Sequence, residues 1–478
     1  MHVQALQSSA PEHHSLFTER HKPEMLGKIL KDIFATNKPP KNQASGNGAP
    51  PKVPLAKQAE RGTILCFYGP SEGNALGQLT RELAAPFQQY AANIEYIDVA
   101  DQNWTRKVNE ALSSPIWFAM SFFGIGQHLN ASNEPNSPNL WTACGIPFLR
   151  LYGDTPAYFP DRHLQIHCGS INGYFDRAHP EFYKRWFPAH GLTTLLPLTL
   201  LDTAPQEELN LSLKHRGKII FPKNGNPPGE LIDYWRLALP RPISEQLEIL
   251  AEESCSVAWI DRDPCLADRL IQNFSTLGID IASEPAALLF LIAQLDDYLR
   301  RVKSTMIAES LLDLPVIIRG KSWQHVNFTG KQAIQDPDSD MGRTQRLIDQ
   351  APAVIDMSPN KQYSAHDRIR RAAGRWTAFL TNETEFFNTL LPSPERFTFK
   401  FERQAIRACV EHYALHPEEA VELGIEQGQR LREIYTDAAY VHSVEAAVAV
   451  SAMRMMERPL GTQPFVDFPP KHFGKYSA

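Results

Sequence analysis

Apolar residues along most of the chain gather in short runs that alternate with segments of helical periodicity. The run Thr63–Tyr68 is mostly apolar, and Leu79, Leu83 and Phe87 follow it at helical spacing. Because strands buried on both faces read as apolar runs, this alternation indicates a parallel sheet covered by helices. Further strands of this first series are expected at 94–99, 116–123, 147–152, 164–168 and 194–200.

A second series of the same kind begins near Arg216. Strands are expected at 218–221, 316–318, 354–357 and 377–381, helices at 230–239, 244–253, 266–277, 286–312 and 366–375, and a helical tail at 402–456. The two series predict an α/β protein with two Rossmann-like domains that face a cleft. Ligands of such sheets bind beyond the carboxyl ends of the strands, so the loops at those ends hold the candidate residues.

The first 60 residues differ from the rest. The segment Asn37–Pro54 is rich in Pro, Gly, Asn and Lys and lacks apolar periodicity, which is typical of a flexible linker. Upstream, residues 23–34 carry an apolar helical face that could dock elsewhere or pack on its own domain. We therefore expect a flexible N-terminal extension with a short helix at 1–60, domains at 61–210 and 211–435, and a C-terminal helix and tail at 436–478 that could pack back on the N-terminal domain.

The composition is that of a globular protein. The chain has 478 residues and a formal net charge of −6, which argues against nucleic acid as a partner. Its longest apolar run, Ala286–Ala293, is well short of the ~20 residues of a membrane span, and the N-terminus lacks a signal-peptide core. The six cysteines are scattered without a CxxC pair, so we expect reduced core thiols, no metal site and a cytoplasmic location.

Three loops of the N-terminal half place polar side chains after predicted strands. Glu72 follows the first strand in a Gly-containing turn, His128 follows the strand at 116–123, and Asp154 follows the strand at 147–152. Backbone N–H groups of the Glu72 turn could approach a ligand, but an ordinary strand-to-helix turn reads the same way. Asp154 precedes Thr155-Pro156, and an aspartate there is also a common turn former.

The C-terminal half carries a basic loop after the strand at 316–318. Arg319 and Lys321 could neutralise a diphosphate, and Trp323 offers a flat apolar face.

A helix start follows the strand at 354–357. Ser364 is a suitable N-cap, and together with His366 and Arg368 it makes an anion site plausible, although an ordinary surface helix fits the same residues. After the next strand, Glu383 or Glu385 could approach a ribose.

The run His366–Phe386 contains, in this order, a His-x-Arg helix start, a small-residue patch with Gly and a Leu-Thr strand end. It resembles the C-terminal signature of one known family, the CgeB-like spore-maturation glycosyltransferases. The segments Leu314–Trp323, Ala353–Ser358 and Cys144–Pro156 resemble further elements of the same family. The resemblance spans roughly 63–435.

The resemblance implies a GT-B fold in which residues 211–435 hold a nucleotide-sugar donor such as a UDP-sugar, and residues 61–210 hold the acceptor. It implies neither a catalytic metal nor a cofactor beyond the donor, which is a co-substrate. Carried over by motif, His366, Arg368, Gly374 and Thr381 would contact the diphosphate and ribose, and Arg319 and Lys321 would reach the same phosphates. This chain departs from the family at Ala365, where a Gly is usual. The acidic ribose partner is Glu383 or Glu385, and the choice stays open.

An inverting transferase also needs a base on the acceptor side. Asp154 and His128 are the candidates, with Glu72 behind them, whereas a retaining enzyme needs no such base. The acceptor is unidentified and could be a protein, a glycan or a small molecule. Two alternatives remain at this point: another nucleotide-sugar enzyme such as an epimerase, or a non-catalytic GT-B-like module that binds a glycan or a protein.

Overall fold

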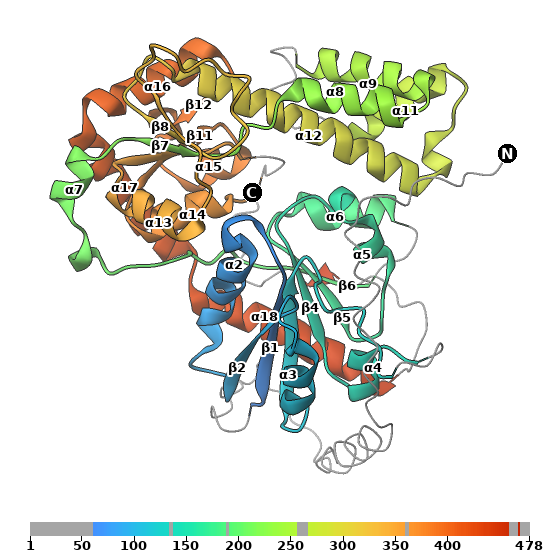
Figure 1. Cartoon of the computed structure of the whole chain (residues 1–478). Helices are drawn as coiled ribbons and strands as arrows, with labels where there is room; N and C mark the ends of the chain where they lie inside the picture. The colour runs from blue at the N-terminus through green and yellow to red at the C-terminus, as the bar shows by residue number, and fades with distance from the viewer. Residues whose placement is uncertain are drawn as a thin grey trace.

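The computed structural model describes residues 61–132, 137–187, 191–255, 266–358, 363–457 and 467–468. Figure 1 shows two α/β domains, one above the other, and a layer of helices beside the upper one. The extension expected at 1–60 lies outside the described residues.

The N-terminal domain contains a seven-stranded sheet in the order β13-β6-β5-β4-β3-β1-β2, and every pair of neighbouring strands is parallel. Its strands are β1 (Thr63–Tyr68), β2 (Asn93–Asp98), β3 (Ile116–Phe122), β4 (Phe148–Tyr152), β5 (Ser170–Tyr174), β6 (Leu192–Leu195) and β13 (Asp467–Phe468). Its helices are α2 (Ala75–Ala84), α3 (Trp104–Ala111), α4 (Leu140–Cys144), α5 (Pro160–Leu164) and α6 (Ala178–Trp186).

One strand of this sheet was expected at the wrong place. The prediction put it at 164–168, but β5 is Ser170–Tyr174, the sequence Ser-Ile-Asn-Gly-Tyr, and Leu164 ends α5 instead. Asn and Gly have low strand propensity. This segment therefore forms a strand because it is buried between β4 and β6, and not because of its intrinsic propensity.

The C-terminal domain contains a six-stranded parallel sheet in the order β12-β11-β10-β7-β8-β9. Its strands are β7 (Ile220–Pro222), β8 (Ile317–Arg319), β9 (Ile334–Asp336), β10 (Ala353–Ile355), β11 (Ala378–Asn382) and β12 (Thr398–Phe399). Its helices are α7 (Leu211–Arg216), α13 (Met341–Gln350), α14 (Asp367–Gly374), α15 (Glu385–Leu390), α16 (Arg403–Leu415) and α17 (Pro417–Ile434). The edge strands β9 and β12 were not predicted. The predicted α/β class with two Rossmann-like domains is confirmed.

Between β7 and β8 in sequence, the described residues form four helices. They are α8 (Pro228–Ala238), α9 (Arg241–Ser254), α11 (Leu266–Thr276) and α12 (Pro285–Ser310). Buried side chains of this layer, among them Trp235 and Leu295, share one apolar cluster with Tyr174 and Tyr183 of the N-terminal domain. The helical layer therefore joins the two domains, and α12 leads from it back to the C-terminal sheet (Figure 1).

The last long helix, α18 (Asp437–Glu457), returns to the N-terminal domain (Figure 1). The buried ring of Tyr440 lies 5.7 Å from the ring of Phe87 and 6.5 Å from that of Phe175. The Ser451 hydroxyl donates to the carbonyl of Gly169 over 3.0 Å. These contacts make α18 a covering helix of the N-terminal sheet.

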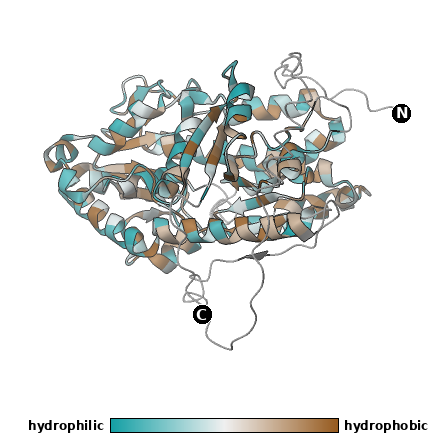
Figure 2. Cartoon of the chain, turned by 90° about the horizontal axis from the view of Figure 1, so that it is seen from below, coloured by the Kyte–Doolittle hydropathy of each residue, from teal (hydrophilic) through white to brown (hydrophobic). Residues whose placement is uncertain are grey.

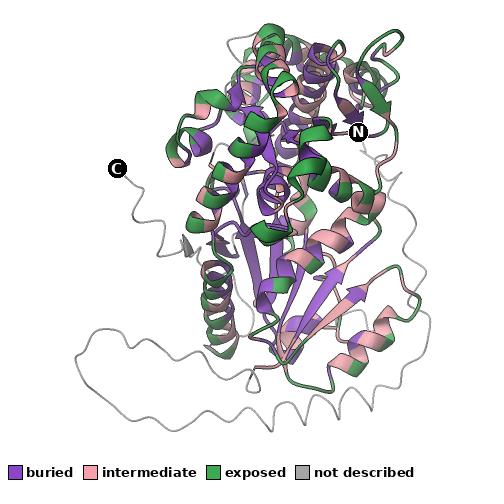
Figure 3. Cartoon of the chain, turned by 90° about the vertical axis from the view of Figure 1, so that its left-hand side faces the viewer, coloured by how far each residue is buried: buried purple, intermediate pink, exposed green. Residues whose placement is uncertain are grey.

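Apolar and polar residues alternate along the outer helices, as Figure 2 shows. Figure 3 shows the strands of the N-terminal sheet as largely buried and the outward faces of the helices as exposed. Within the described ranges, no helix combines the length and the apolar composition that a membrane span requires.

Candidate functional site

The carboxyl ends of strands from the two sheets meet between the domains. Residues that follow β1, β4 and β5 contact residues of the C-terminal domain and of α12. The backbone N–H of Tyr363, for example, donates to the carboxylate of Asp176 after β5 over 3.0 Å. The loops after β1, β4 and β5 therefore face the C-terminal domain and α12 across one interdomain region.

Glu72 reaches across this region from the turn after β1. Its carboxylate accepts a hydrogen bond from Asn224 over 2.9 Å and pairs with Lys321 over 3.1 Å. Partial burial alone would raise the pKa of Glu72, but hydrogen bonds from Ser339, Lys321 and Asn224 lower it below its ordinary value. Glu72 thus joins the domains as an ionised carboxylate, which makes it a weak proton acceptor.

Gly73 allows this turn to approach the C-terminal domain. Its φ is +58°, and a Cβ built on it would lie 2.2 Å from the carbonyl oxygen of Ser339. A larger residue at this position would therefore push the two loops apart.

Asp154, after β4, is held by the helical layer. Its carboxylate lies 3.1 Å from the guanidinium of Arg300 on α12. Arg300 also pairs with Asp296 over 2.8 Å and lies over the ring of Tyr158, whose hydroxyl donates to Asp296 over 2.6 Å. Burial would lower the pKa of Arg300, but Asp296, Tyr158 and Asp154 raise it above its ordinary value. Arg300 was not predicted as a site residue.

Lys223, the first residue after β7, is the main residue that the sequence analysis missed. It makes no ion pair within the part of the chain that the structure describes. Burial lowers the pKa of Lys223 to about 8; the nearby cations Arg368 and Arg300 lower it further, and Asp356 and Asp154 act in the opposite direction. The four charged groups that shift this pKa come from the N-terminal domain, the C-terminal domain and α12. Its only sequence signal is its place directly after an apolar run.

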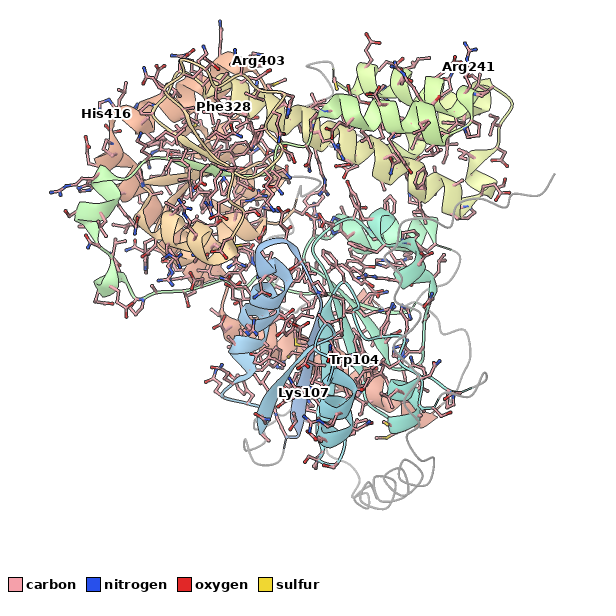
Figure 4. The ribbon with its side chains drawn as sticks, in the orientation of Figure 1. Trp104, Lys107, Arg241, Phe328, Arg403 and His416 are labelled. Atoms are coloured by element: carbon pink, nitrogen blue, oxygen red, sulfur yellow. The ribbon has the colours of Figure 1, made fainter. Side chains whose placement is uncertain are left out.

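Two cations of the outer helices are balanced locally. Figure 4 labels Lys107 on α3, which pairs with Asp101 over 2.7 Å, and Arg241 on α9, which pairs with Glu245 over 2.6 Å. Lys223 has no such partner among the described residues, and Arg368 and Arg300 also act on it, a combination that favours an anion.

The start of α14 brings three predicted groups to the same region. His366 is the N-cap residue of the helix, and its Nδ1 lies 3.2 Å from Asp356 and 3.0 Å from Asp367. Arg368 forms a short ion pair with Asp356. Ser364 is buried, and its hydroxyl has no hydrogen-bond partner among the described residues. It was expected as the N-cap, but the helix starts two residues later.

Arg319 and Trp323 differ from what was expected of them. The guanidinium of Arg319 is 1% exposed and pairs with Asp336 over 2.5 Å and with Asp338 over 3.1 Å. Because two carboxylates already balance its charge, it holds the loop after β9 and is not available to a diphosphate. Trp323 is fully buried and donates from its indole nitrogen to the carbonyl of Lys223 over 2.8 Å. Its ring therefore offers no open face to a ligand.

Gly374 also lies away from the proposed diphosphate. It ends α14, eight residues after His366, which is ~12 Å along a helix. A Cβ on it would meet the carbonyl oxygen of Leu201 at 2.2 Å, so its small size serves the packing of the interdomain linker.

Three more residues come from the end of β11. Thr381 is buried one residue before the strand ends, and its hydroxyl has no partner among the described residues. Glu383 and Glu385 follow the strand, and both are exposed. The geometry leaves the choice between the two glutamates as open as the sequence did.

His128 belongs to a different environment. Its Nε2 lies 2.8 Å from the side chain of Gln127. Burial of the ring, together with Arg150 and Arg162, lowers the pKa of His128 to about 4. These partners belong to its own domain, so the structure does not bring His128 together with the group around Lys223.

The fold places this molecule in a structural class. Two Rossmann-like domains with facing strand ends and a C-terminal helix that crosses back to the first domain form a GT-B fold, as predicted. No protein-family model matches the chain, and no curated protein matches it.

Several solved structures are similar over most of the chain. The DNA-modifying enzyme β-glucosyltransferase is 10% identical, with a TM-score of 0.42. An α-glucosyltransferase in complex with UDP-glucose and DNA is 7% identical, with a TM-score of 0.44, and the Anabaena protein HepE in complex with UDP and glucose is 9% identical, with a TM-score of 0.39. In each comparison 81% of this chain and 99% of the other are covered. These likenesses concern the fold alone.

Proposed function

We propose that the protein is a glycosyltransferase that moves a sugar from a nucleotide-sugar donor to an acceptor hydroxyl. One observation carries this proposal: the partly buried, unpaired Lys223 lies near Arg368 after the strands of one domain and near Asp154 after a strand of the other. Such a site offers positive charge to a leaving diphosphate and a carboxylate to an incoming hydroxyl. The resemblance to CgeB-like enzymes stays a prediction within this proposal.

On the donor side, Lys223 and Arg368 would neutralise the diphosphate as it departs. The first N–H groups of α14 would add to this, because a helix N-terminus carries partial positive charge. Fixed cations that meet charge developing in the transition state lower the barrier without a metal ion. The mechanism we propose is therefore metal-independent.

On the acceptor side, Asp154 is the better of the predicted bases. Glu72 is already held by three groups of the C-terminal domain, and His128 lies in another environment. In the inverting reaction, the acceptor oxygen bonds to the anomeric carbon and the bond from that carbon to the donor phosphate breaks. The hydroxyl proton passes to Asp154. A retaining reaction would use the same cations but not this base.

Calorimetry with UDP, GDP, ADP and UDP-glucose tests the donor site. We expect the wild-type protein to bind one of the nucleotides and Lys223→Met to weaken that binding at least tenfold. Lys331→Met is the matched control, because Lys331 pairs with Asp313 over 2.9 Å in the loop between β8 and β9, and we expect unchanged affinity. Equal affinity in wild type and Lys223→Met would contradict the donor role.

Product analysis then separates the alternatives. Transfer to a member of a panel of protein, glycan, small-molecule and DNA acceptors supports the transferase, whereas conversion of the donor alone indicates an epimerase. If the protein binds none of the nucleotides, the non-catalytic binding module becomes the better reading. The net charge of −6 argues against DNA.

A further inference from the structure

The buried carboxylate of Asp356 organises the start of α14. Its Oδ1 lies 3.2 Å from Nδ1 of His366 and forms the short ion pair with Arg368. We propose that Asp356 is the positioning residue of this site, fixing His366 and Arg368 in one arrangement with a single oxygen atom. The inference deepens the proposed donor site, on which its functional consequence rests.

The position of Asp356 is itself fixed by the sheet. It directly follows β10, and its backbone N–H donates to the carbonyl of Leu380 in β11 over 2.9 Å. The residue is fully buried. A carboxylate held by the sheet in this way gives His366 and Arg368 a rigid reference, whereas an exposed partner would let two long side chains sample several rotamers.

The carboxylate remains charged because its partners are cations and proton donors. Burial alone would raise the pKa of Asp356, but His366 and Arg368 bring it down to about 2. Its second oxygen, Oδ2, has no hydrogen-bond partner among the described residues. Its polar contacts to both side chains are therefore made through Oδ1, which ties the histidine and the arginine to each other.

The contacts also select one tautomer of the imidazole. Nδ1 of His366 faces Oδ1 of Asp356 and Oδ1 of Asp367, and ionised carboxylates only accept hydrogen bonds. The Arg368 guanidinium is the more distant neighbour, at 3.3 Å. Nδ1 therefore carries a proton, and in the neutral ring the lone pair lies on Nε2, at the edge away from the carboxylates.

This arrangement has a consequence for a bound diphosphate. Without Asp356, Arg368 would lose its only ion pair among the described residues and His366 would lose one of two carboxylate partners. Both side chains would then gain rotamer freedom that ligand binding must remove again. We expect the loss of Asp356 to weaken diphosphate binding through these two residues, although Asp356 itself does not touch the ligand.

A double-mutant cycle separates positioning from general destabilisation. Asp356→Asn and Arg368→Met should each weaken nucleoside diphosphate binding about tenfold. In the double variant we expect no more than twofold loss beyond Arg368→Met, because the aspartate acts mainly through the arginine and the remaining loss is the share of His366. Asp176→Asn is the matched control, since Asp176 is also fully buried after a strand but accepts from the backbone of Ala178 and Tyr363. Its effect should add to that of Arg368→Met.

The tautomer of His366 can be measured in the wild-type protein, without a ligand and without a variant. In the wild-type protein labelled with ¹⁵N-histidine, the nitrogen shifts of His366 should show the proton on Nδ1, and in Asp356→Asn this preference should decrease. A wild-type His366 protonated on Nε2 alone, or an additive Asp356–Arg368 cycle, would overturn the proposal. If the wild type binds no nucleotide, the donor site fails while the tautomer still tests the positioning.

Discussion

The carboxylate of Asp154 and the guanidinium of Arg300 lie 3.1 Å apart, although 146 residues separate them in the sequence. The pair joins the end of β4 to α12 and directs a carboxylate of one domain toward the helices and strands of the other. Arg300 is itself held by Asp296, so Asp154 has a defined direction rather than a free surface position.

This relationship leads to the first prediction. Asp154→Asn keeps the size and the contact to Arg300 but removes the proton acceptor, so turnover should fall at least 100-fold while nucleotide affinity changes less than threefold. Steady-state kinetics and calorimetry on the same preparations measure the two quantities. Unchanged turnover would remove Asp154 as the base and favour a retaining reaction.

The second prediction concerns pH. The pKa of Lys223 is lowered to about 8, so the ammonium loses its proton as the pH rises through that value. Diphosphate affinity should therefore decrease above pH 8, by up to tenfold per pH unit. Lys223→Arg stays charged to higher pH, and its affinity should remain flat between pH 7 and 9.5. Parallel profiles for the two proteins would show that another group titrates.

The third prediction tests the contact between the turn after β1 and the loop after β9. Gly73→Ala and Gly145→Ala both place a methyl group on a residue with positive φ, but nothing lies within 4 Å of the Cβ at Gly145. Backbone strain should cost each variant about 1 kcal/mol, and Gly73→Ala should lose a further 1–2 kcal/mol, roughly, through its clash with Ser339. Urea unfolding measures both, and equal losses would mean that the turn moves freely.

Arg319 provides the fourth prediction. Its removal leaves Asp336 with only the more distant Arg343, at 3.6 Å, and breaking a buried ion pair from one side costs about 3–5 kcal/mol. Arg319→Met should therefore lower the free energy of unfolding by several kcal/mol, while folded protein retains its diphosphate affinity. If the diphosphate affinity of Arg319→Met fell as much as that of Lys223→Met, Arg319 would belong to the donor site after all.

The last prediction concerns metal removal. Because Lys223 and Arg368 supply the positive charge, activity should persist after treatment with EDTA and should not rise on addition of Mg²⁺ or Mn²⁺. An assay with and without chelator, on protein freed of metal by dialysis, measures this. Loss of activity that Mg²⁺ restores would require a different account of the leaving group.

The sequence predicts much of the edge of the site. His366, Arg368 and Asp154 all follow apolar strands, and the topology of a parallel sheet carries such residues to its carboxyl edge whatever their neighbours are. Asp356 lies in the segment Ala353–Ser358, but the sequence did not mark it as a site residue. A single aspartate after a strand does not indicate which side chains will contact it. Lys223 was missed for the same reason.

Local pattern misjudged the environment of the basic loop. The sequence pattern predicted Arg319 and Trp323 as exposed ligand-binding residues after a strand. In the structure, Asp336 at the end of β9 and Asp338 just after it pair with the arginine. The indole of Trp323 donates to the carbonyl of Lys223. The predicted position of β5 was wrong by a few residues, because the strand is stabilised by burial between its neighbours and its own Asn-Gly sequence gives a weak strand signal.

Hydrophobic periodicity encodes which face of each element is buried, so the two α/β domains and the loops at their carboxyl edges follow from the amino-acid sequence alone. The tertiary structure decided which charges are balanced: Arg319 is neutralised, Asp154 meets Arg300, and Lys223 is left without a partner among the described residues. The physical reason is that a charge is balanced by whatever lies within a few ångströms, and here that partner comes from a segment far away in the chain.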